Sequence, residues 1–123
     1  MHGFNQGADL VNHWCNMKSF DVLLIQEHWL SPAMLNRFND IIGSDYFCFA
    51  FSSMAVTCSA DVLRGRPYGG LAIIVKKDYH KVCRCVFNSD RLVVILIESA
   101  LIANVYFPCL SRADHKEVTL ELL

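Results

Sequence analysis

Short apolar runs joined by short polar linkers constrain the fold of this chain more than any other feature. Residues 21–26 form a continuous, mainly apolar run, which predicts a strand buried on both faces and packed by a helix on one side. Five later runs also have the composition of strands. The linkers among the last four are short, as in hairpins, and His80 falls in one of these predicted turns. The five later runs are residues 46–51, 71–75, 81–87, 92–97 and 101–106.

Helical periodicity is clearest before the first of these runs. In residues 6–18, Leu10 and Trp14 lie four positions apart, as do Val11 and Cys15. Side chains at this spacing share one face of a helix, so the segment is predicted to be a helix with a single apolar stripe.

A second helix is expected over residues 31–43, with Ser31 as its N-cap and Gly43 at its end. Residues 52–67 are polar, small and interrupted by Gly and Pro, which indicates a loop. Residues 114–123 have the pattern of the start of a third helix. The order of these elements indicates an α/β (α+β) fold within one domain.

Composition excludes several classes of protein. A chain with 54% hydrophobic and 19% charged residues is not a solvated, disordered one. The formal net charge is −1 and no basic stripe is present, so nucleic-acid binding would have to come from a local site. No run of about 18 apolar residues predicts a membrane span. Nothing in the sequence indicates a membrane or an obligate protein partner.

The cysteines and the first residues bear on the compartment. The chain has six cysteines, several of them inside apolar runs, where a thiol behaves as a small hydrophobic group. The first residues lack the charged and apolar regions of a signal peptide. We therefore expect an intracellular chain, cytoplasmic or nuclear, with reduced thiols.

Glu27 is the first candidate for chemistry because it directly follows the apolar run 21–26. The ends of strands are where ligands bind in open α/β sheets. A hard cation such as Mg²⁺ is usually held by one or two carboxylates together with substrate phosphate oxygens. Position alone also allows an ordinary solvated glutamate at a strand end.

Four stretches, in order along the chain, resemble motifs of the endonuclease/exonuclease/phosphatase (DNase I-like) family. Residues 21–30 resemble its Asp-hydrophobic-Gln-Glu motif, and they are most similar to the endonuclease domains of non-LTR retrotransposons, which often continue with a His and an aromatic residue. Residues 2–7 resemble the tail of the first motif, Asn-x-x-Gly. Residues 65–73 resemble a glycine-containing turn into a central strand, and residues 104–108 match Asn-x-Tyr-x-Pro.

The resemblance implies roles for two residues. Glu27 corresponds to the glutamate that binds the catalytic Mg²⁺, and Tyr106 to the tyrosine whose hydroxyl helps to hold the scissile phosphate. The implied partner is DNA. The implied fold is the first half of a four-layer α/β/β/α sandwich, with residues 1–123 as an incomplete domain. Without the resemblance, Tyr106 would be interpreted as a strand aromatic that packs in the sheet.

The chain also departs from the family pattern. The first asparagine of the family would lie three residues before Gly3, ahead of Met1. No Gly-Asp-x-Asn motif follows Tyr106, and the terminal Asp-His motif that supplies the general base is missing. Asp114-His115 comes too soon after Tyr106 to take that role. The expected function is a fragment of a metal-dependent DNA endonuclease, inactive as it stands.

Two alternatives remain. In the first, the chain is a non-catalytic remnant or interaction module with the same partial fold. In the second, it is a phosphatase- or sphingomyelinase-like member of the same family. Residues 65–70 lack the Gly-Lys-Ser/Thr ending of a phosphate-binding P-loop, so a tight turn is favoured there. Arg64 and Arg66 flank this turn and are candidates for contacting a DNA backbone in the complete domain.

Overall fold

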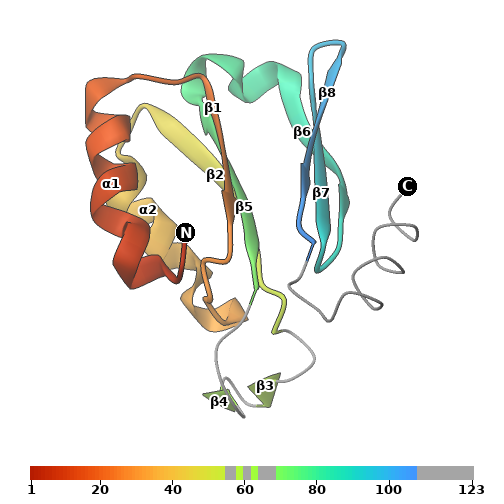
Figure 1. The fold of residues 1–123 in the computed structure, drawn as a ribbon. Coiled ribbons are helices and arrows are strands. Elements are labelled where there is room, and N and C mark those ends of the chain that lie inside the picture. Colours follow the sequence, from red (N-terminus) through yellow and green to blue (C-terminus); the bar gives the residue numbers. More distant parts are fainter. Residues whose placement is uncertain (55–57, 60–61, 64–68, 108–123) are drawn as a thin grey trace.

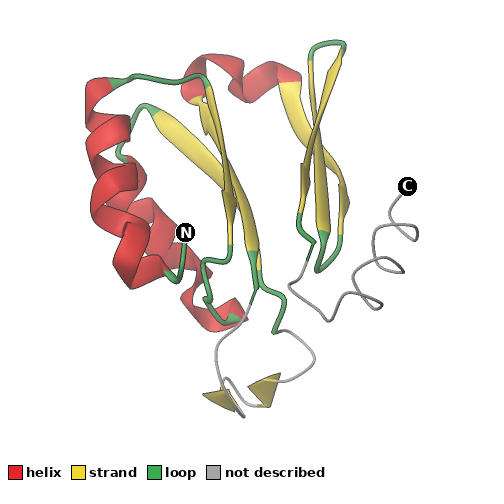
Figure 2. Cartoon of the chain, viewed as in Figure 1, coloured by secondary structure: helices red, strands yellow, loops and turns green. Residues whose placement is uncertain are grey.

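The computed structural model describes residues 1–54, 58–59, 62–63 and 69–107, and in these ranges the chain has an α+β fold in three layers. Helices α1 (Phe4–Met17) and α2 (Asn39–Ile42) lie on one face of a first sheet, and a second sheet faces its other side (Figure 1). Figure 2 shows the same layers, with the two sheets facing each other and a short helix, Lys77–Val82, linking them at one end. The α+β class expected from the sequence is confirmed.

The first sheet is antiparallel, in the order β1-β5-β2. Its strands are β1 (Val22–Gln26), β5 (Leu71–Lys76) and β2 (Tyr46–Phe51). The central strand β5 is buried on both faces. Ala72 and Ile74 pack with the helices, while Leu71, Ile73 and Val75 pack with the second sheet. The side-chain alternation of one strand thus supplies both cores of the molecule.

The strand β1 is less buried than the sequence predicted. Val22 contacts the core between the sheets, and Leu23 and Ile25 contact the core under the helices, so both faces are packed in part. Leu24, however, is 42% exposed. The cause is topological, because β1 lies at an edge of the described sheet.

The second sheet is an antiparallel meander of β6 (Cys83–Asn88), β7 (Leu92–Ile97) and β8 (Ala100–Val105). In β7, Val93, Ile95 and Ile97 face the first sheet and are buried. Exposed apolar side chains of this sheet include Leu101 and Phe87. The predicted strands at 92–97 and 101–106 are confirmed within one residue. A separate short ladder joins β3 (Cys58–Ser59) to β4 (Val62–Leu63), within the segment predicted to be a loop.

The helix α1 begins at Phe4, two residues earlier than predicted, and ends at Met17. Of its predicted stripe, only Val11 and Cys15 are buried. Leu10 and Trp14 are 52% and 36% exposed. The buried face of the helix is the line from Phe4 through Val11 to Cys15, which packs with Ile25 and Ile74.

The second predicted helix is wrong in type over most of its length. Residues Pro32–Phe38 form the 3₁₀ helix η1, and only the four residues of α2 are α-helical. Ser31 has an extended backbone but makes no side-chain capping bond. Since η1 buries only Phe38, packing does little to stabilise a regular α-helix there. Gly43 does end α2, with φ 75°.

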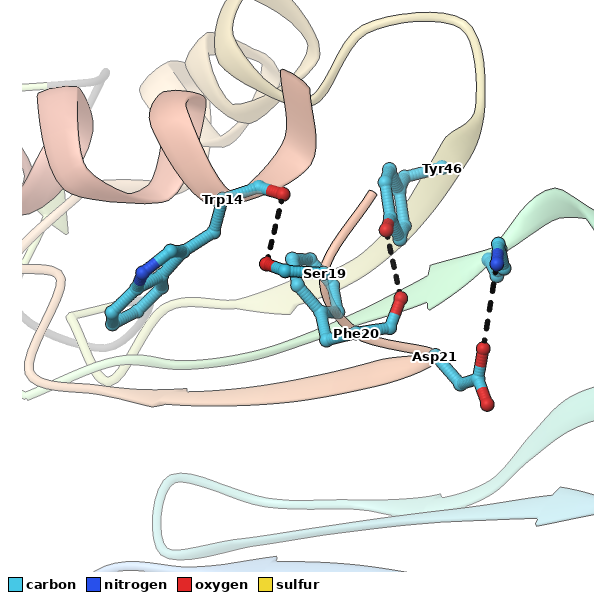
Figure 3. Close-up of polar contacts among 6 residues, drawn as sticks. Trp14, Ser19, Phe20, Asp21 and Tyr46 are labelled. Carbon is cyan, nitrogen blue, oxygen red and sulfur yellow. Dashed lines mark hydrogen bonds and ion pairs between the residues drawn. The ribbon is translucent and has the colours of Figure 1, made fainter. Parts of the chain in front are cut away.

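The connection from β5 to β6 is a crossover between sheets and not a hairpin. It is the 3₁₀ helix η2 (Lys77–Val82), and it contains His80, whose ring contacts that of Phe47. Figure 3 shows contacts at this end of the first sheet, where Ser19 Oγ donates to the carbonyl of Trp14 and the Tyr46 hydroxyl donates to that of Phe20. The prediction of hairpin-like linkers among the last four strands is therefore wrong for the connection from β5 to β6 and correct for those that join β6, β7 and β8.

Two thiols form part of the core under the helices, where Cys15 is buried and Cys48 is partly buried. Burial raises the pKa of Cys15 to about 11 and that of Cys48 to about 12, the latter with a smaller contribution from Cys15. Both groups are therefore neutral at physiological pH.

The predicted helix at 114–123 lies outside the described residues. Of the helices that the structure describes, none has the length and apolar character needed to cross a membrane.

Candidate functional site

A tight turn follows β1 and carries Glu27, His28 and Trp29. Glu27 and Trp29 both have left-handed backbone conformations, with φ 59° and 61°. Four backbone hydrogen bonds hold the turn. The amides of Glu27 and Trp29 donate to the carbonyls of Gly70 and Gly69, at 2.8 and 2.9 Å, and the carbonyls of Glu27 and His28 accept from the amides of Gly3 and Phe4, at 2.9 and 2.7 Å. The turn is thus clamped between the start of α1 and the start of β5.

Two glycines permit this close packing. Gly3 has φ 86° and Gly70 has φ 97°, which L side chains rarely adopt. A Cβ on Gly3 would lie 2.6 Å from Cε3 of Trp29, and a Cβ on Gly70 would overlap the imidazole of His28. Both positions therefore need glycine for space as well as for backbone conformation.

The side chain of His28 is fully buried, and its hydrogen bonds define one tautomer. Its Nδ1 accepts from the amide of Leu30 at 2.9 Å. Its Nε2 lies 2.9 Å from the carbonyl oxygen of Phe51, so Nε2 carries the proton and donates. Burial lowers the pKa of His28 below 6.5, against smaller raising contributions from backbone hydrogen bonds with Phe51 and Leu71. A neutral imidazole thus joins the turn to the end of β2.

The carboxylate of Glu27 has two distinct surroundings. The Tyr106 hydroxyl donates to Oε1 at 2.7 Å. The other oxygen, Oε2, lies 3.7 Å from Nδ1 of His2, too far for a hydrogen bond but within ion-pair range of a protonated imidazole. The Glu27 side chain is 29% exposed, so the carboxylate is reachable from solvent. Tyr106 follows β8, and its ring also packs against the core between the sheets.

A hydrogen-bond network of two side-chain amides, buried Asn104 and exposed Gln26, lies next to this pair in the chain. Asn104, 1% exposed, donates through Nδ2 to the carbonyls of Ile25 (3.0 Å) and Ala72 (3.1 Å). Its Oδ1 accepts from Nε2 of Gln26 at 3.2 Å, and the same nitrogen donates to the carbonyl of Val105 at 2.6 Å. Asn104 and Gln26 precede Tyr106 by two residues and Glu27 by one. The network therefore bonds β8 to β1 and β5 next to the two candidate residues.

The donor set fits one anchor for Mg²⁺. Magnesium keeps several waters and is commonly bound through one or two carboxylates plus substrate phosphates. Glu27 offers one carboxylate, whose Oε2 is the oxygen not bonded to Tyr106. Over the described ranges, no three His, Cys, Asp or Glu side chains gather as a metal cluster. A cation at Glu27 would therefore depend on water or phosphate for most of its ligands.

The sequence-predicted residues have different outcomes. Glu27 and Tyr106 lie within hydrogen-bonding distance, although 79 positions separate them. Arg64 and Arg66 lie outside the described residues. Sequence reasoning gave no role to His2, His28 or Asn104, which complete the surroundings of the turn. A signal for Asn104 existed, since a polar residue inside an apolar strand usually has hydrogen-bonding partners.

Neither the models of known protein families nor the curated proteins include a match to this chain.

Proposed function

We propose that Glu27 and Tyr106 are the metal-binding and phosphate-contacting residues of a phosphodiesterase site of the endonuclease/exonuclease/phosphatase type, with Mg²⁺ as cofactor and DNA as substrate. The observation that carries the proposal is the 2.7 Å hydrogen bond between them. The two residues belong to separate sequence motifs, and they follow strands of different sheets. If Tyr106 only packed in the sheet and Glu27 were only a solvated side chain, no hydrogen bond between them would be expected.

In the proposed site, the two carboxylate oxygens of Glu27 have different roles. The hydroxyl of Tyr106 fixes Oε1, which leaves Oε2 as the oxygen for a cation. Glu27 would hold the cation, and the Tyr106 hydroxyl would contact the phosphate. The metal, when bound, polarises the phosphate and eases departure of the leaving oxygen. Glu27 and Tyr106 orient the phosphate, and this is the contribution of the present chain to the reaction.

By this proposal, the chain does not turn over DNA on its own. Its sequence contains no Gly-Asp-x-Asn motif to orient the nucleophile. Loss of a general base alone typically costs about 10²–10⁴ in rate. The corresponding fold is the first half of a four-layer α/β/β/α sandwich of the DNase I-like type. The helical layer and the two facing sheets support that assignment.

Metal binding gives the sharpest test, because it does not depend on turnover. Mn²⁺ is titrated into the isotope-labelled chain, and paramagnetic broadening of backbone amide signals is mapped by NMR. Broadening should centre on Glu27 and Tyr106, and Glu27→Gln should abolish it. Glu98→Gln is the matched control, because Glu98 also directly follows a strand with a left-handed backbone, φ 54°.

Two results would contradict the proposal. One is broadening that is unchanged in Glu27→Gln or is centred away from the turn. The other is Mg²⁺-dependent nicking of supercoiled DNA by this chain that survives Glu27→Gln. Absence of metal binding in the wild type would favour the alternative of a non-catalytic interaction module.

A further inference from the structure

A cavity of about 270 Å³ opens beside the turn that carries Glu27. Its walls come from the start of α1, from the turn itself and from η1. Polar side chains in the lining include Asn5, Gln6 and Arg37, and Trp29 contributes an aromatic wall. His2 lines the cavity too, and its Nδ1 is the atom 3.7 Å from Glu27 Oε2. Glu27 itself is not among the lining residues, so His2 is the side chain that lies between the cavity and the candidate metal ligand.

The positively charged side chain of this cavity, Arg37, is held by two contacts. Nη2 of Arg37 donates to Oδ1 of Asn5 at 2.9 Å, and the guanidinium lies 4.5 Å from the centre of the Phe4 ring. An arginine carries five N–H donors in a planar fork that matches phosphate geometry. The bond to Asn5 uses one of them, and stacking on Phe4 orients the rest of the plane.

The aromatic wall is kept at the surface by the backbone. Trp29 has φ 61° and is 37% exposed, although it is among the largest apolar side chains of the molecule. Its ring system packs against Gly3 and meets the imidazole of His2 edge-on, at 6.3 Å between ring centres. An indole held in a strained turn beside an arginine is an arrangement for stacking a planar ligand.

We propose that this cavity binds one unpaired nucleotide of the DNA strand, next to the scissile phosphate, with the base stacked on Trp29 and the phosphate paired with Arg37. The inference rests on the proposed function, since it identifies the ligand beside Glu27. The volume lies just below the roughly 300–1,000 Å³ of drug-sized pockets, which suits a single nucleotide and excludes a duplex.

The charge of the chain fits this mode of binding. With a net charge of −1 and no basic stripe, the chain cannot rely on general attraction to phosphates. Stacking on an aromatic side chain does not depend on net charge, and one arginine supplies a single phosphate contact. Affinity for single strands should therefore show a shallow salt dependence, and Arg37→Gln should reduce the slope of log K against log salt by about 0.7.

The two tryptophans of the chain allow a direct test. Trp14→Phe leaves Trp29 as the sole indole, and Trp29→Phe leaves only Trp14, on α1 outside this cavity. Each variant is titrated with oligothymidylate and with its duplex, without divalent metal and in the Glu27→Gln background. Single strands should quench the emission of Trp29 and leave that of Trp14 unchanged, and the duplex should quench neither.

Affinity of a dye-labelled oligothymidylate, measured by anisotropy, completes the test. Trp29→Ala should weaken binding about tenfold, the typical effect of losing one stacked base. Arg37→Gln should weaken it as well. Arg84→Gln, which removes an exposed positive charge on β6, is the charge-matched control and should have no effect. Circular dichroism verifies folding of each variant.

The inference is overturned if oligothymidylate fails to bind, if it binds without quenching Trp29, or if Arg37→Gln and Arg84→Gln bind equally well. These outcomes are separate from failure of the proposed function. Quenching of Trp29 together with absent Mn²⁺ binding at Glu27 would leave a nucleotide site without the phosphodiesterase. The reverse result would leave the metal site without this pocket.

Discussion

At the scale of single residues, backbone strain is concentrated at the end of β1. Glu27 and Trp29 are non-glycine residues in the left-handed region, and each such conformation costs about 1–3 kcal/mol and persists only where its surroundings hold it. The four backbone hydrogen bonds to the segments around Gly3 and Gly70 supply that support. Strain held by a rigid frame is common at ligand sites, and here it fixes a carboxylate and an indole at the surface.

Gly70→Ala should destabilise the chain by about 2–6 kcal/mol, because a positive φ and an overlap with the His28 ring add together. Gly43→Ala is the control. Gly43 also has a positive φ, 75°, but a Cβ there would meet no atom within 4 Å, so only the backbone cost of about 1–3 kcal/mol remains. Urea unfolding measures both. Equal losses would show that the contact with His28 has no energetic weight.

The neutral state of His28 predicts a dependence of stability on pH. Burial lowers the pKa of the folded state below 6.5, so the unfolded chain binds more protons as the pH falls from 6.5 towards the folded pKa. The free energy of unfolding should be at its full value above pH 6.5 and decline through that window. His28→Asn should flatten the decline, while His13→Asn, at an exposed site on α1, should leave it unchanged. Urea titrations across this pH range measure the free energy of unfolding of each variant. A decline in His28→Asn equal to that of the wild type would contradict the prediction.

At the scale of elements, Asn104 links the two sheets. It donates to the buried carbonyls of Ile25 in β1 and Ala72 in β5, so its loss leaves both without this partner. Asn104→Leu should cost about 2–6 kcal/mol, since each of the two unsatisfied carbonyls costs about 1–3 kcal/mol. Asn88→Leu, at an exposed position of β6, should stay within about 0.5 kcal/mol of the wild type. Thermal and urea unfolding compare the two, and similar losses would remove Asn104 from the frame of the site.

The sequence predicted the strands well because their apolar runs are bounded by clear turn residues. It failed where the path depends on which sheet a strand joins. The crossover at η2 has a polar composition that a hairpin turn would share, so local pattern does not distinguish them. The exposure of Leu24 depends on the position of β1 at an edge of the described sheet, which is a property of the topology.

The candidate site shows the same limit. Motif resemblance predicts Glu27 and Tyr106 as site residues. Their hydrogen bond, however, depends on how the two sheets pack, because 79 positions separate the residues in the chain. No local pattern encodes that alignment. The cavity that includes Trp29 and Arg37 draws on three separate elements, and the left-handed conformation of Trp29 has no signal in residue type, because a tryptophan seldom adopts it.

At the scale of the whole molecule, β5 joins two cores into one unit. Neighbouring residues of this strand point in opposite directions, with Ile74 under the helices and Ile73 between the sheets, and both are fully buried. The second sheet holds Tyr106 and the first holds Glu27, so the site exists only while the sheets stay packed. A chain in which either core opened alone would separate the pair.

Ile73→Ala and Ile74→Ala test whether the two cores unfold together. Each should cost about 2–5 kcal/mol, because each leaves a cavity in a closely packed cluster. If β5 couples the layers, Ile73→Ala should accelerate hydrogen exchange in α1 as well as in β7, and Ile74→Ala should do the same in reverse. Leu101→Ala, at a side chain 68% exposed, is the control and should change little. If Ile73→Ala accelerated exchange in β7 alone, the sheets would separate below global unfolding, and the Glu27–Tyr106 bond would be lost while α1 remained folded.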